Sequence, residues 1–230
     1  MTMIDDNLQT ARARIAAACV AAGRAVDSVT LLAVSKTFSV GEIEQAIAAG
    51  QTCLGENYIQ EAVEKILVLG HGSVQWHCIG PIQSNKTRLV AEHFDWVQSV
   101  DRFKIAQRLS EQRPAHLAPL QICTQVNTDG GTNKAGVAPE ELPALAHAVA
   151  RLPGLKLRGL MSIPEPASDF ATAMALHSRA RQLMDELNAD GLQLDTLSMG
   201  MSADLEAAIH AGSTMVRVGT AIFGGRSRSA

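Results

Sequence analysis

The sequence has few aromatic residues, no long apolar run and no excess of charge of one sign. Phe, Trp and Tyr make up 3% of the 230 residues, so stacking platforms for single-stranded nucleic acid are not expected. The 20 basic and 23 acidic residues give a net charge of −3, which provides no electrostatic attraction to nucleic acid. No segment reaches the roughly 18 consecutive apolar residues of a membrane helix, and residues 1–7 lack the apolar run of a signal peptide. We therefore expect no nucleic-acid partner, no membrane partner and no export signal.

The four cysteines are widely spaced, and the sequence has no Cys-x-x-Cys pair and no nearby pair of histidines to complete a zinc site. In a chain of this size the pattern indicates reduced thiols rather than a disulfide framework. The composition, 47% hydrophobic and 19% charged, excludes a disordered chain. We therefore expect a cytoplasmic globular protein without a metal. The cysteines are Cys19, Cys53, Cys78 and Cys123.

Short apolar runs alternate with amphipathic helical patterns along almost the whole chain. This alternation, with no hairpin signal, predicts an α/β fold: a single (β/α)8 TIM barrel with an extra N-terminal helix at 8–22, in one domain over residues 1–230. An open doubly wound sheet is the alternative, but its first βα turn would usually carry a glycine-rich loop, and here that turn reads Ser-Lys-Thr-Phe. The expected strands span residues 30–36, 53–56, 74–80, 96–100, 120–127, 155–163, 194–200 and 215–219. The expected helices between them span 40–49, 61–69, 85–93, 103–111, 139–151, 170–189 and 203–211.

A barrel places its functional groups at the carboxyl ends of its strands, which selects a short set of residues. Two of them are unusual in apolar strands: Lys36 ends the run Leu-Leu-Ala-Val-Ser-Lys, and Arg217 lies within Met-Val-Arg-Val. The other candidates at these positions are Glu56, Asn57, His77, Asn127, Ser162, Ser202, Gly219 and Thr220.

Lys36 and Arg217 each allow two interpretations. An apolar barrel mouth would disfavour the ammonium form of Lys36 and lower its pKa, as an amine that attacks an aldehyde requires. Otherwise Lys36 is a strand-end lysine that extends to solvent. Arg217 is a permanent cation with hydrogen-bond donors only, so it requires a buried acceptor, either a carboxylate or a ligand atom.

The ends of the last two strands suggest a phosphate site. Ser202 opens the expected helix at 203–211 and supplies a hydroxyl beside the helix N-terminal amides, although it could also serve simply as the N-cap. Gly219 and Thr220 follow the last strand, where bare backbone amides could approach an anion. The loops after strands seven and eight form the customary phosphate site of a barrel. A phosphate held there, an arginine and an aldehyde-reactive lysine together describe pyridoxal 5′-phosphate (PLP).

Six segments carry a specific resemblance that covers essentially the whole chain in order. They read LLAVSKT at 31–37, GENY at 55–58, WHCIGPIQSNK at 76–86, RGLM at 158–161, LSMGMS at 197–202 and VRVGTAIFG at 216–224. In these segments the sequence resembles the PLP homeostasis protein family, which is itself similar to the N-terminal barrel domain of alanine racemases.

The resemblance implies that Lys36 holds PLP as a Schiff base and that Arg217 faces the pyridine nitrogen. It implies further cofactor contacts from Asn57 near the ring and from Ser202, Gly219 and Thr220 at the phosphate. The family is regarded as carriers or homeostasis factors for vitamin B6 with no established turnover.

The sequence departs from the family in the loop after the fifth strand. Gly131 stands where relatives commonly carry a glutamate, so a role that depends on that acid is in doubt, while Lys134 is retained. Lys86 and Lys134 are expected on loops at the barrel mouth, where each could briefly accept PLP during transfer or serve as a solvated surface lysine.

The expected contact to the pyridine nitrogen favours binding over turnover. An arginine there leaves the nitrogen largely unprotonated, which makes PLP a weaker electron sink. Racemases tolerate that arrangement, but they need a base on each face of the cofactor. Lys36 can serve one face, and in alanine racemases a second domain delivers a tyrosine to the other. Tyr58 is the only tyrosine in this chain, nothing places it opposite Lys36, and His77 is more often a structural histidine than a base. We therefore expect no efficient enzyme activity.

Three hypotheses follow from these residues. The first is a monomeric barrel that holds PLP and exchanges it with apo PLP-dependent enzymes or with the free pool. The second is an amino-acid racemase of low activity. The third is a barrel that binds another phosphorylated ligand, with Lys36 as an ordinary ion-pairing residue.

Overall fold

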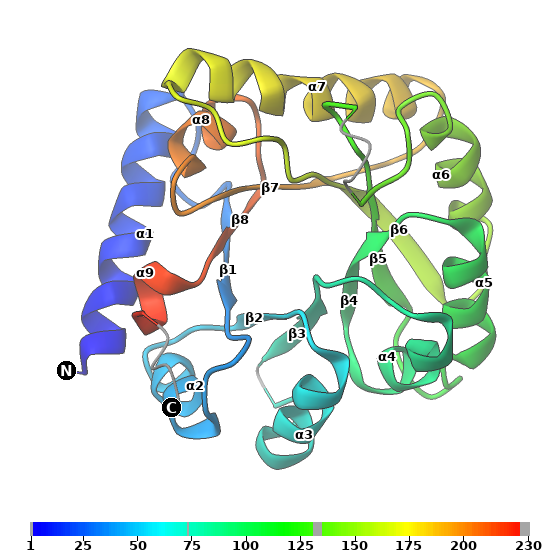
Figure 1. The fold of residues 1–230 in the computed structure, drawn as a ribbon, viewed down its shortest axis with the longest axis horizontal. Coiled ribbons are helices and arrows are strands. Elements are labelled where there is room, and N and C mark those ends of the chain that lie inside the picture. The colour runs from blue at the N-terminus through cyan, green and yellow to red at the C-terminus, as the bar shows by residue number, and fades with distance from the viewer. Residues whose placement is uncertain (1, 73, 131–134, 226–230) are drawn as a thin grey trace.

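The computed structural model describes residues 2–72, 74–130 and 135–225, and within them eight parallel strands close into a barrel. Each strand pairs with the next along the chain, and β8 pairs with β1 to complete the ring (Figure 1). The predicted (β/α)8 barrel is therefore confirmed. The strands are β1 (Thr30–Val34), β2 (Cys53–Glu56), β3 (Gln75–Cys78), β4 (Trp96–Val100), β5 (Leu120–Gln125), β6 (Leu155–Met161), β7 (Thr196–Met201) and β8 (Met215–Val218).

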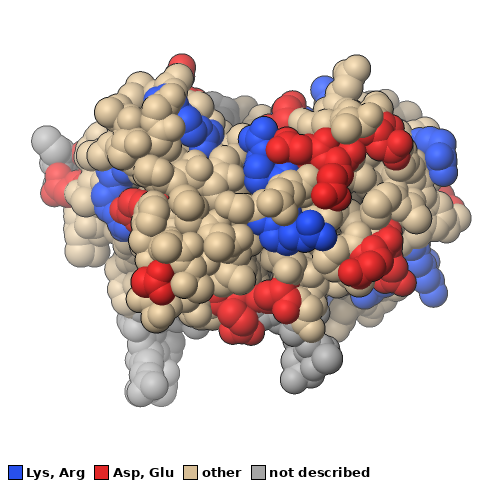
Figure 2. Space-filling model, turned by 90° about the horizontal axis from the view of Figure 1, so that it is seen from above, with Lys and Arg blue, Asp and Glu red and all other residues tan. Residues whose placement is uncertain are grey.

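Helices surround the barrel as an outer layer, and the predicted N-terminal helix packs against the side of this layer that holds α2, α8 and α9 (Figure 1). Among the described residues, no helix is long and apolar enough to span a bilayer. Figure 2 shows acidic and basic side chains interspersed over the face seen from above. The helices are α1 (Met3–Ala21), α2 (Val40–Ala48), α3 (Ile59–Leu69), the short 3-10 helix η1 (Ser84–Lys86), α4 (Thr87–His93), α5 (Phe103–Gln112), α6 (Leu142–Ala150), α7 (Phe170–Ala189), α8 (Leu205–His210) and α9 (Thr220–Phe223).

Apolar side chains pack on both sides of the strands. Along β1, Leu31 and Ala33 belong to the large cluster between the strands and the helices. Leu32 belongs to a separate cluster with Cys53 and Met215, so the alternation of a strand places these three side chains inside the barrel. Residues that are two apart on a strand share a face, which puts Arg217 inside the barrel, one step above Met215 toward the carboxyl ends.

Several element boundaries differ from the predicted ones, and two of these differences lie beside the barrel mouth. The first strand ends at Val34 rather than at residue 36, because the Phe38 amide donates to the Ser35 carbonyl and closes a turn. The expected helix at 203–211 begins instead at Leu205. The carboxylate of Asp204 accepts from the Met201 amide at 2.7 Å and stabilises a turn there, so Ser202 is not the N-cap.

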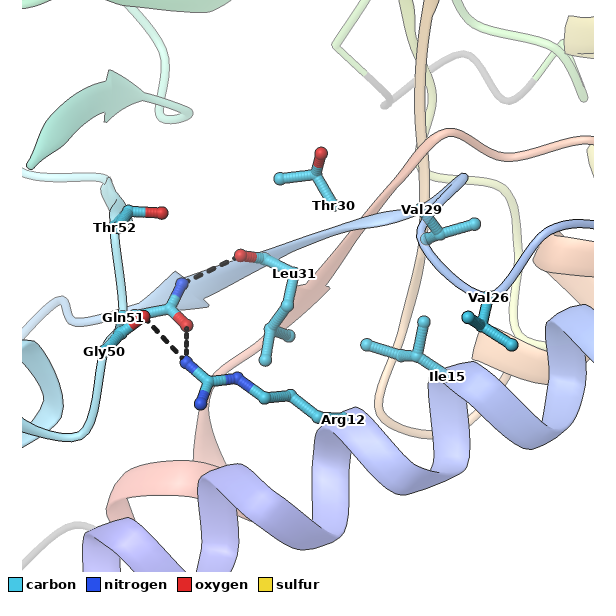
Figure 3. Close-up of a pocket in the computed structure, with 9 residues that line it drawn as sticks. All are labelled: Arg12, Ile15, Val26, Val29, Thr30, Leu31, Gly50, Gln51 and Thr52. Atoms are coloured by element: carbon cyan, nitrogen blue, oxygen red, sulfur yellow. Dashed lines mark hydrogen bonds between the residues drawn. The ribbon is translucent and has the colours of Figure 1, made fainter.

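A cavity of about 310 Å³ lies beside the amino ends of β1 and β2 (Figure 3). Arg12 reaches across it from α1, and its Nη2 donates to the Gly50 carbonyl and to Gln51 Oε1. Gln51 Nε2 donates in turn to the carbonyls of Leu31 and Cys53. These polar groups bond to one another, and they attach α1 to the floor of the barrel.

His77 is a buried titratable group inside the barrel. Its side chain is fully buried, and its ring stacks on Trp96 with centroids 5.1 Å apart. Burial lowers the pKa of His77 from 6.5 to about 3, because a charged imidazole would lose its hydration. The ring is therefore neutral near neutral pH.

The buried His77 predicts a specific loss of stability in acid. Between pH 6.5 and about 3 this histidine takes up a proton in the unfolded chain but not in the folded one. The unfolded state binds more protons, so the free energy of unfolding falls as the pH falls, by up to about 1.4 kcal/mol per pH unit. Urea titrations over this range should give a shallower pH dependence for His77→Gln. The exposed His116→Gln should keep the native slope, and equal slopes for all three proteins would contradict the assignment.

Candidate functional site

A cavity of about 390 Å³ opens at the carboxyl ends of the strands, and all six residues predicted as cofactor contacts line it. This volume lies within the range of about 300–1,000 Å³ that is typical of small-molecule pockets. Apolar side chains, among them Val34, Ile79 and Ile163, form the rest of the wall. The predicted residues on the wall are Lys36, Asn57, Ser202, Arg217, Gly219 and Thr220.

Arg217 enters this cavity from β8 and is 5% exposed. Its Nη1 donates to the carbonyl and to the hydroxyl of Ser198, each at 2.8 Å, and its Nη2 donates to the Ser162 carbonyl at 2.9 Å. No carboxylate of the described residues forms an ion pair with Arg217, so the carboxylate interpretation is wrong. Burial lowers the pKa of Arg217 to about 10, with Asp204 acting in the opposite direction, so the guanidinium stays cationic at neutral pH. Three hydrogen bonds orient it and leave donors for a ligand.

Lys36 lies in the turn that follows β1 and contributes to the cavity wall. The next residue, Thr37, has φ +68°, a left-handed conformation that is unfavourable for a β-branched side chain and costs about 1–3 kcal/mol. The Thr37 amide donates to Glu61 Oε1 at 2.6 Å, so a side chain of α3 helps to hold this conformation. The turn redirects the chain directly beside Lys36, at the mouth of the barrel.

A buried ionic cluster, which was not predicted from the sequence, lies beneath the Lys36 turn. Lys65 Nζ donates to the Ser35 carbonyl at 2.9 Å, to Glu56 Oε1 at 2.9 Å and to Glu61 Oε1 at 2.6 Å. The Ser35 hydroxyl donates to the same Glu56 oxygen at 2.7 Å. Burial raises the pKa of Glu56, and the charge of Lys65 opposes this shift. The cluster connects β2 and α3 to the backbone on both sides of Lys36.

Asn57 presents an unsatisfied polar atom beside the cavity. Its Oδ1 is buried and has no hydrogen-bond partner among the described residues. A Cβ at Gly80 would clash with the carbonyl oxygen of Asn57, so the chain approaches this backbone closely because residue 80 is a glycine. An unpaired buried carbonyl is costly, which makes Asn57 a natural contact for a bound ligand.

The predicted phosphate loop is held from outside the barrel. Arg14 on α1 donates to the Ser202 carbonyl at 3.2 Å, and His177 on α7 bonds to the Asp204 carboxylate at 2.9 Å. On the other side of the site, Gly219 precedes α9, and a Cβ there would lie 3.3 Å from Val34. Ser202, Gly219 and Thr220 therefore meet at one edge of the cavity, as the sequence predicted.

Several other candidates do not reach the cavity. Tyr58 is 53% exposed and His77 is sealed in the barrel, so neither lines the wall. Lys86 Nζ bonds to Gln60 Oε1 at 3.2 Å, away from the cavity wall. The departure at Gly131 and the proposed role of Lys134 lie outside the described residues. Within the described ranges, no cluster of three His, Cys, Asp or Glu side chains could hold a metal.

The four cysteines, which are potential nucleophiles, are all buried and form no disulfide. Burial raises the pKa of the Cys78 and Cys123 thiols to about 12, so both stay protonated near neutral pH. Burial also raises the pKa of Cys53. None of the four lines the cavity.

A parallel barrel with a lysine, an arginine and hydroxyl groups around one mouth places the chain in a known structural class. The family model described as "Alanine racemase, N-terminal domain" matches residues 5–227. The solved alanine racemase from Corynebacterium glutamicum is 17% identical and superimposes with a TM-score of 0.69 over 96% of this chain and 59% of its own, which is a likeness of fold.

Relatives of higher identity narrow this class. The chain is 57% identical over its full length to the pyridoxal phosphate homeostasis protein of Pseudomonas aeruginosa and 50% identical to that of Escherichia coli, covering 99% of each. It therefore belongs to the pyridoxal phosphate homeostasis protein family. The solved structure of PipY from Synechococcus elongatus with PLP bound is 37% identical and has a TM-score of 0.84, over 96% of this chain and all of that one.

The buried cluster predicts a large cost for removing Lys65. Lys65→Met leaves the fully buried Glu56 without its counter-charge, and loss of one partner of a buried ion pair typically costs about 3–5 kcal/mol. Chemical denaturation should show a loss of this size. Adding Glu56→Gln should restore part of it, because the uncompensated charge is removed.

Lys104→Met on the exposed face of α5 is the matched control. A surface substitution of this kind changes stability by less than about 0.5 kcal/mol. A Lys65→Met protein as stable as this control would show that the cluster contributes nothing to the fold.

Proposed function

We propose that this protein binds PLP as a Schiff base on Lys36 and acts in intracellular PLP homeostasis as a carrier or buffer. The observation that carries the proposal is the convergence of Lys36, Arg217, Ser202 and Thr220 on one cavity. The names of the relatives and the PLP-bound PipY structure support the choice of ligand. We propose further that residues 1–230 form one PLP-binding domain, since the strands from β1 to β8 all contribute to the same ring.

The residues of the cavity fit the chemical groups of this cofactor. When bound, PLP supplies an aldehyde that condenses with a primary amine and a pyridine ring that can accept electron density. The amine of Lys36 would take the aldehyde. The hydroxyls of Ser202 and Thr220, with the backbone at Gly219, would hold the phosphate. The unpaired Asn57 Oδ1 would gain a partner near the ring.

Arg217 would make the bound cofactor a weaker electron sink, an arrangement that racemases nevertheless tolerate. Its guanidinium stays cationic and donates only, so a ring nitrogen that faces it accepts a hydrogen bond and receives no proton. A pyridine ring in that state is a weak electron sink, and it stabilises a substrate carbanion poorly.

Among the described residues that line the cavity, we find no second base of the kind a racemase requires, and this carries the proposal of a holder. His77 is buried away from the wall, and Tyr58 is exposed outside it. We therefore propose a protein without efficient turnover. The proposal includes a monomer in the cytoplasm that passes PLP to apo PLP-dependent enzymes, in keeping with four unpaired cysteines.

The covalent link predicts a defined chemical modification. Borohydride reduction of the protein saturated with PLP, followed by peptide mass spectrometry, should locate one stable pyridoxyl group on Lys36. Lys36→Ala should abolish the imine absorbance. Arg217→Met should keep the adduct but shift its absorbance and weaken binding. An adduct that forms unchanged in Lys36→Ala would show that another amine holds the cofactor.

The carrier role predicts transfer faster than passive release. The PLP-loaded protein is mixed with an apo PLP-dependent enzyme in the presence of a trap for free PLP, and recovery of that enzyme's activity is followed. Recovery should exceed the rate at which the loaded protein releases PLP to the trap alone. Recovery limited to this passive rate would contradict the carrier role, and the protein would then act only as a buffer of PLP.

The same preparation distinguishes a PLP-binding protein without turnover from a racemase of low activity. Alanine or serine incubated in deuterium oxide with the PLP-loaded protein should gain no deuterium at Cα above the level seen with Lys36→Ala. Incorporation that scales with protein concentration and is absent in Lys36→Ala would instead favour a racemase.

A further inference from the structure

A chain of buried hydrogen bonds crosses the barrel interior. It runs from Arg217 on β8 to His77 on β3. Arg217 Nη1 donates to the Ser198 hydroxyl at 2.8 Å, and that hydroxyl donates to Gln98 Oε1 at 2.7 Å. Gln98 Nε2 lies 3.0 Å from His77 Nδ1 and 3.1 Å from the Met215 sulfur. Ser198, Gln98 and His77 are each fully buried, and none of them lines the ligand cavity.

The chemistry of the groups gives this chain one direction. Arg217 can only donate, so the Ser198 oxygen accepts and its own hydrogen must point to Gln98. The Met215 thioether can only accept, so the Gln98 atom beside it is the amide nitrogen and the Ser198 side of Gln98 is the oxygen. His77 Nδ1 must then accept from Gln98, which leaves the proton of the neutral ring on Nε2.

Maintaining such a chain through the core has a cost that packing alone does not explain. A buried polar group without a partner is destabilising, and His77 Nε2 has no hydrogen-bond partner among the described residues. An apolar layer at these positions would avoid that cost. What the chain supplies is an oriented acceptor, the Ser198 hydroxyl, which restrains the Arg217 guanidinium together with the carbonyls of Ser198 and Ser162.

We propose that Ser198 and Gln98 are positioning residues that hold the Arg217 guanidinium with its remaining donors directed at the heteroaromatic ring of the bound ligand. His77 is the neutral terminal acceptor of this chain. The inference rests on the proposed function, since the ring in question is that of PLP. It assigns no contact between these three residues and the ligand, because all of them act through Arg217.

The first test removes one hydrogen bond to Arg217. Ser198→Ala should shift the absorbance of the PLP-loaded protein and speed PLP release by about tenfold, as expected for a lost hydrogen bond to a charged group. Ser213→Ala is the matched control, because the Ser213 hydroxyl is equally buried but lies within hydrogen-bond distance of the carbonyls of Leu197, Met199 and Met215 instead. Its absorbance and release rate should equal those of the native protein.

The second test reverses the hydrogen bond between residue 98 and His77 by a substitution that hardly changes the shape of the side chain. The carboxylate introduced by Gln98→Glu can accept from Ser198 but cannot donate to His77. Nitrogen NMR of the protein without PLP should therefore show the Nε2-protonated neutral ring of His77 in the native chain. In Gln98→Glu it should show a proton on Nδ1. With PLP loaded, this variant should also differ from the native protein in the pH dependence of its absorbance.

The outcomes separate the inference from the proposed function. A native protein that forms no PLP adduct overturns both. A native protein that binds PLP, with Ser198→Ala and Gln98→Glu identical to Ser213→Ala in absorbance and release, overturns the positioning role alone. An Nδ1-protonated His77 in the native protein also overturns it, because the chain would then run in the opposite direction.

Discussion

The burial of one permanent positive charge shapes the upper half of this barrel. A guanidinium removed from water needs acceptors for its protons, and Arg217 finds them in two backbone carbonyls and one hydroxyl rather than in a carboxylate. A carboxylate partner would have neutralised the charge inside the protein. With neutral acceptors the charge persists and faces the cavity, so the site favours a ligand with a negative phosphate and an exposed lone pair.

The two sides of the mouth are held by different means. At the carboxyl end of β1, a strained turn beside Lys36 is fixed by a cluster of charges that lies under it. At the end of β7, the Ser202 loop is fixed by side chains from the outer helices α1 and α7. The amine and the hydroxyl therefore belong to separately supported segments, and the arginine between them is the element that connects the site to the core.

The sequence was sufficient to find Lys36 and Arg217, since a lysine or arginine in an apolar strand is unusual. The ends of the last two strands pointed to Ser202, Gly219 and Thr220, and the family resemblance added Asn57; all six line one cavity. The sequence was not sufficient to find Gln98 and Ser198. Both lie on strands whose register shifts, β4 near Val97 and Val100 and β7 near Ser198 and Met201. A shift of this kind breaks the two-residue alternation from which an inward direction is read. The start of α8 was misplaced because a side-chain hydrogen bond of Asp204 competes with the helix.

The distribution of thiols bears on which nucleophile an electrophilic ligand meets. An aldehyde reacts with sulfur as well as with nitrogen, and a thiolate in the wall would capture it as a competing hemithioacetal. Here the sulfur atoms are withdrawn into the packed interior, and at Cys78 and Cys123 they are held in the unreactive protonated form. The fold thereby favours chemoselectivity by exclusion: an aldehyde in this cavity would meet the amine of Lys36, while all four sulfhydryls lie away from the cavity wall.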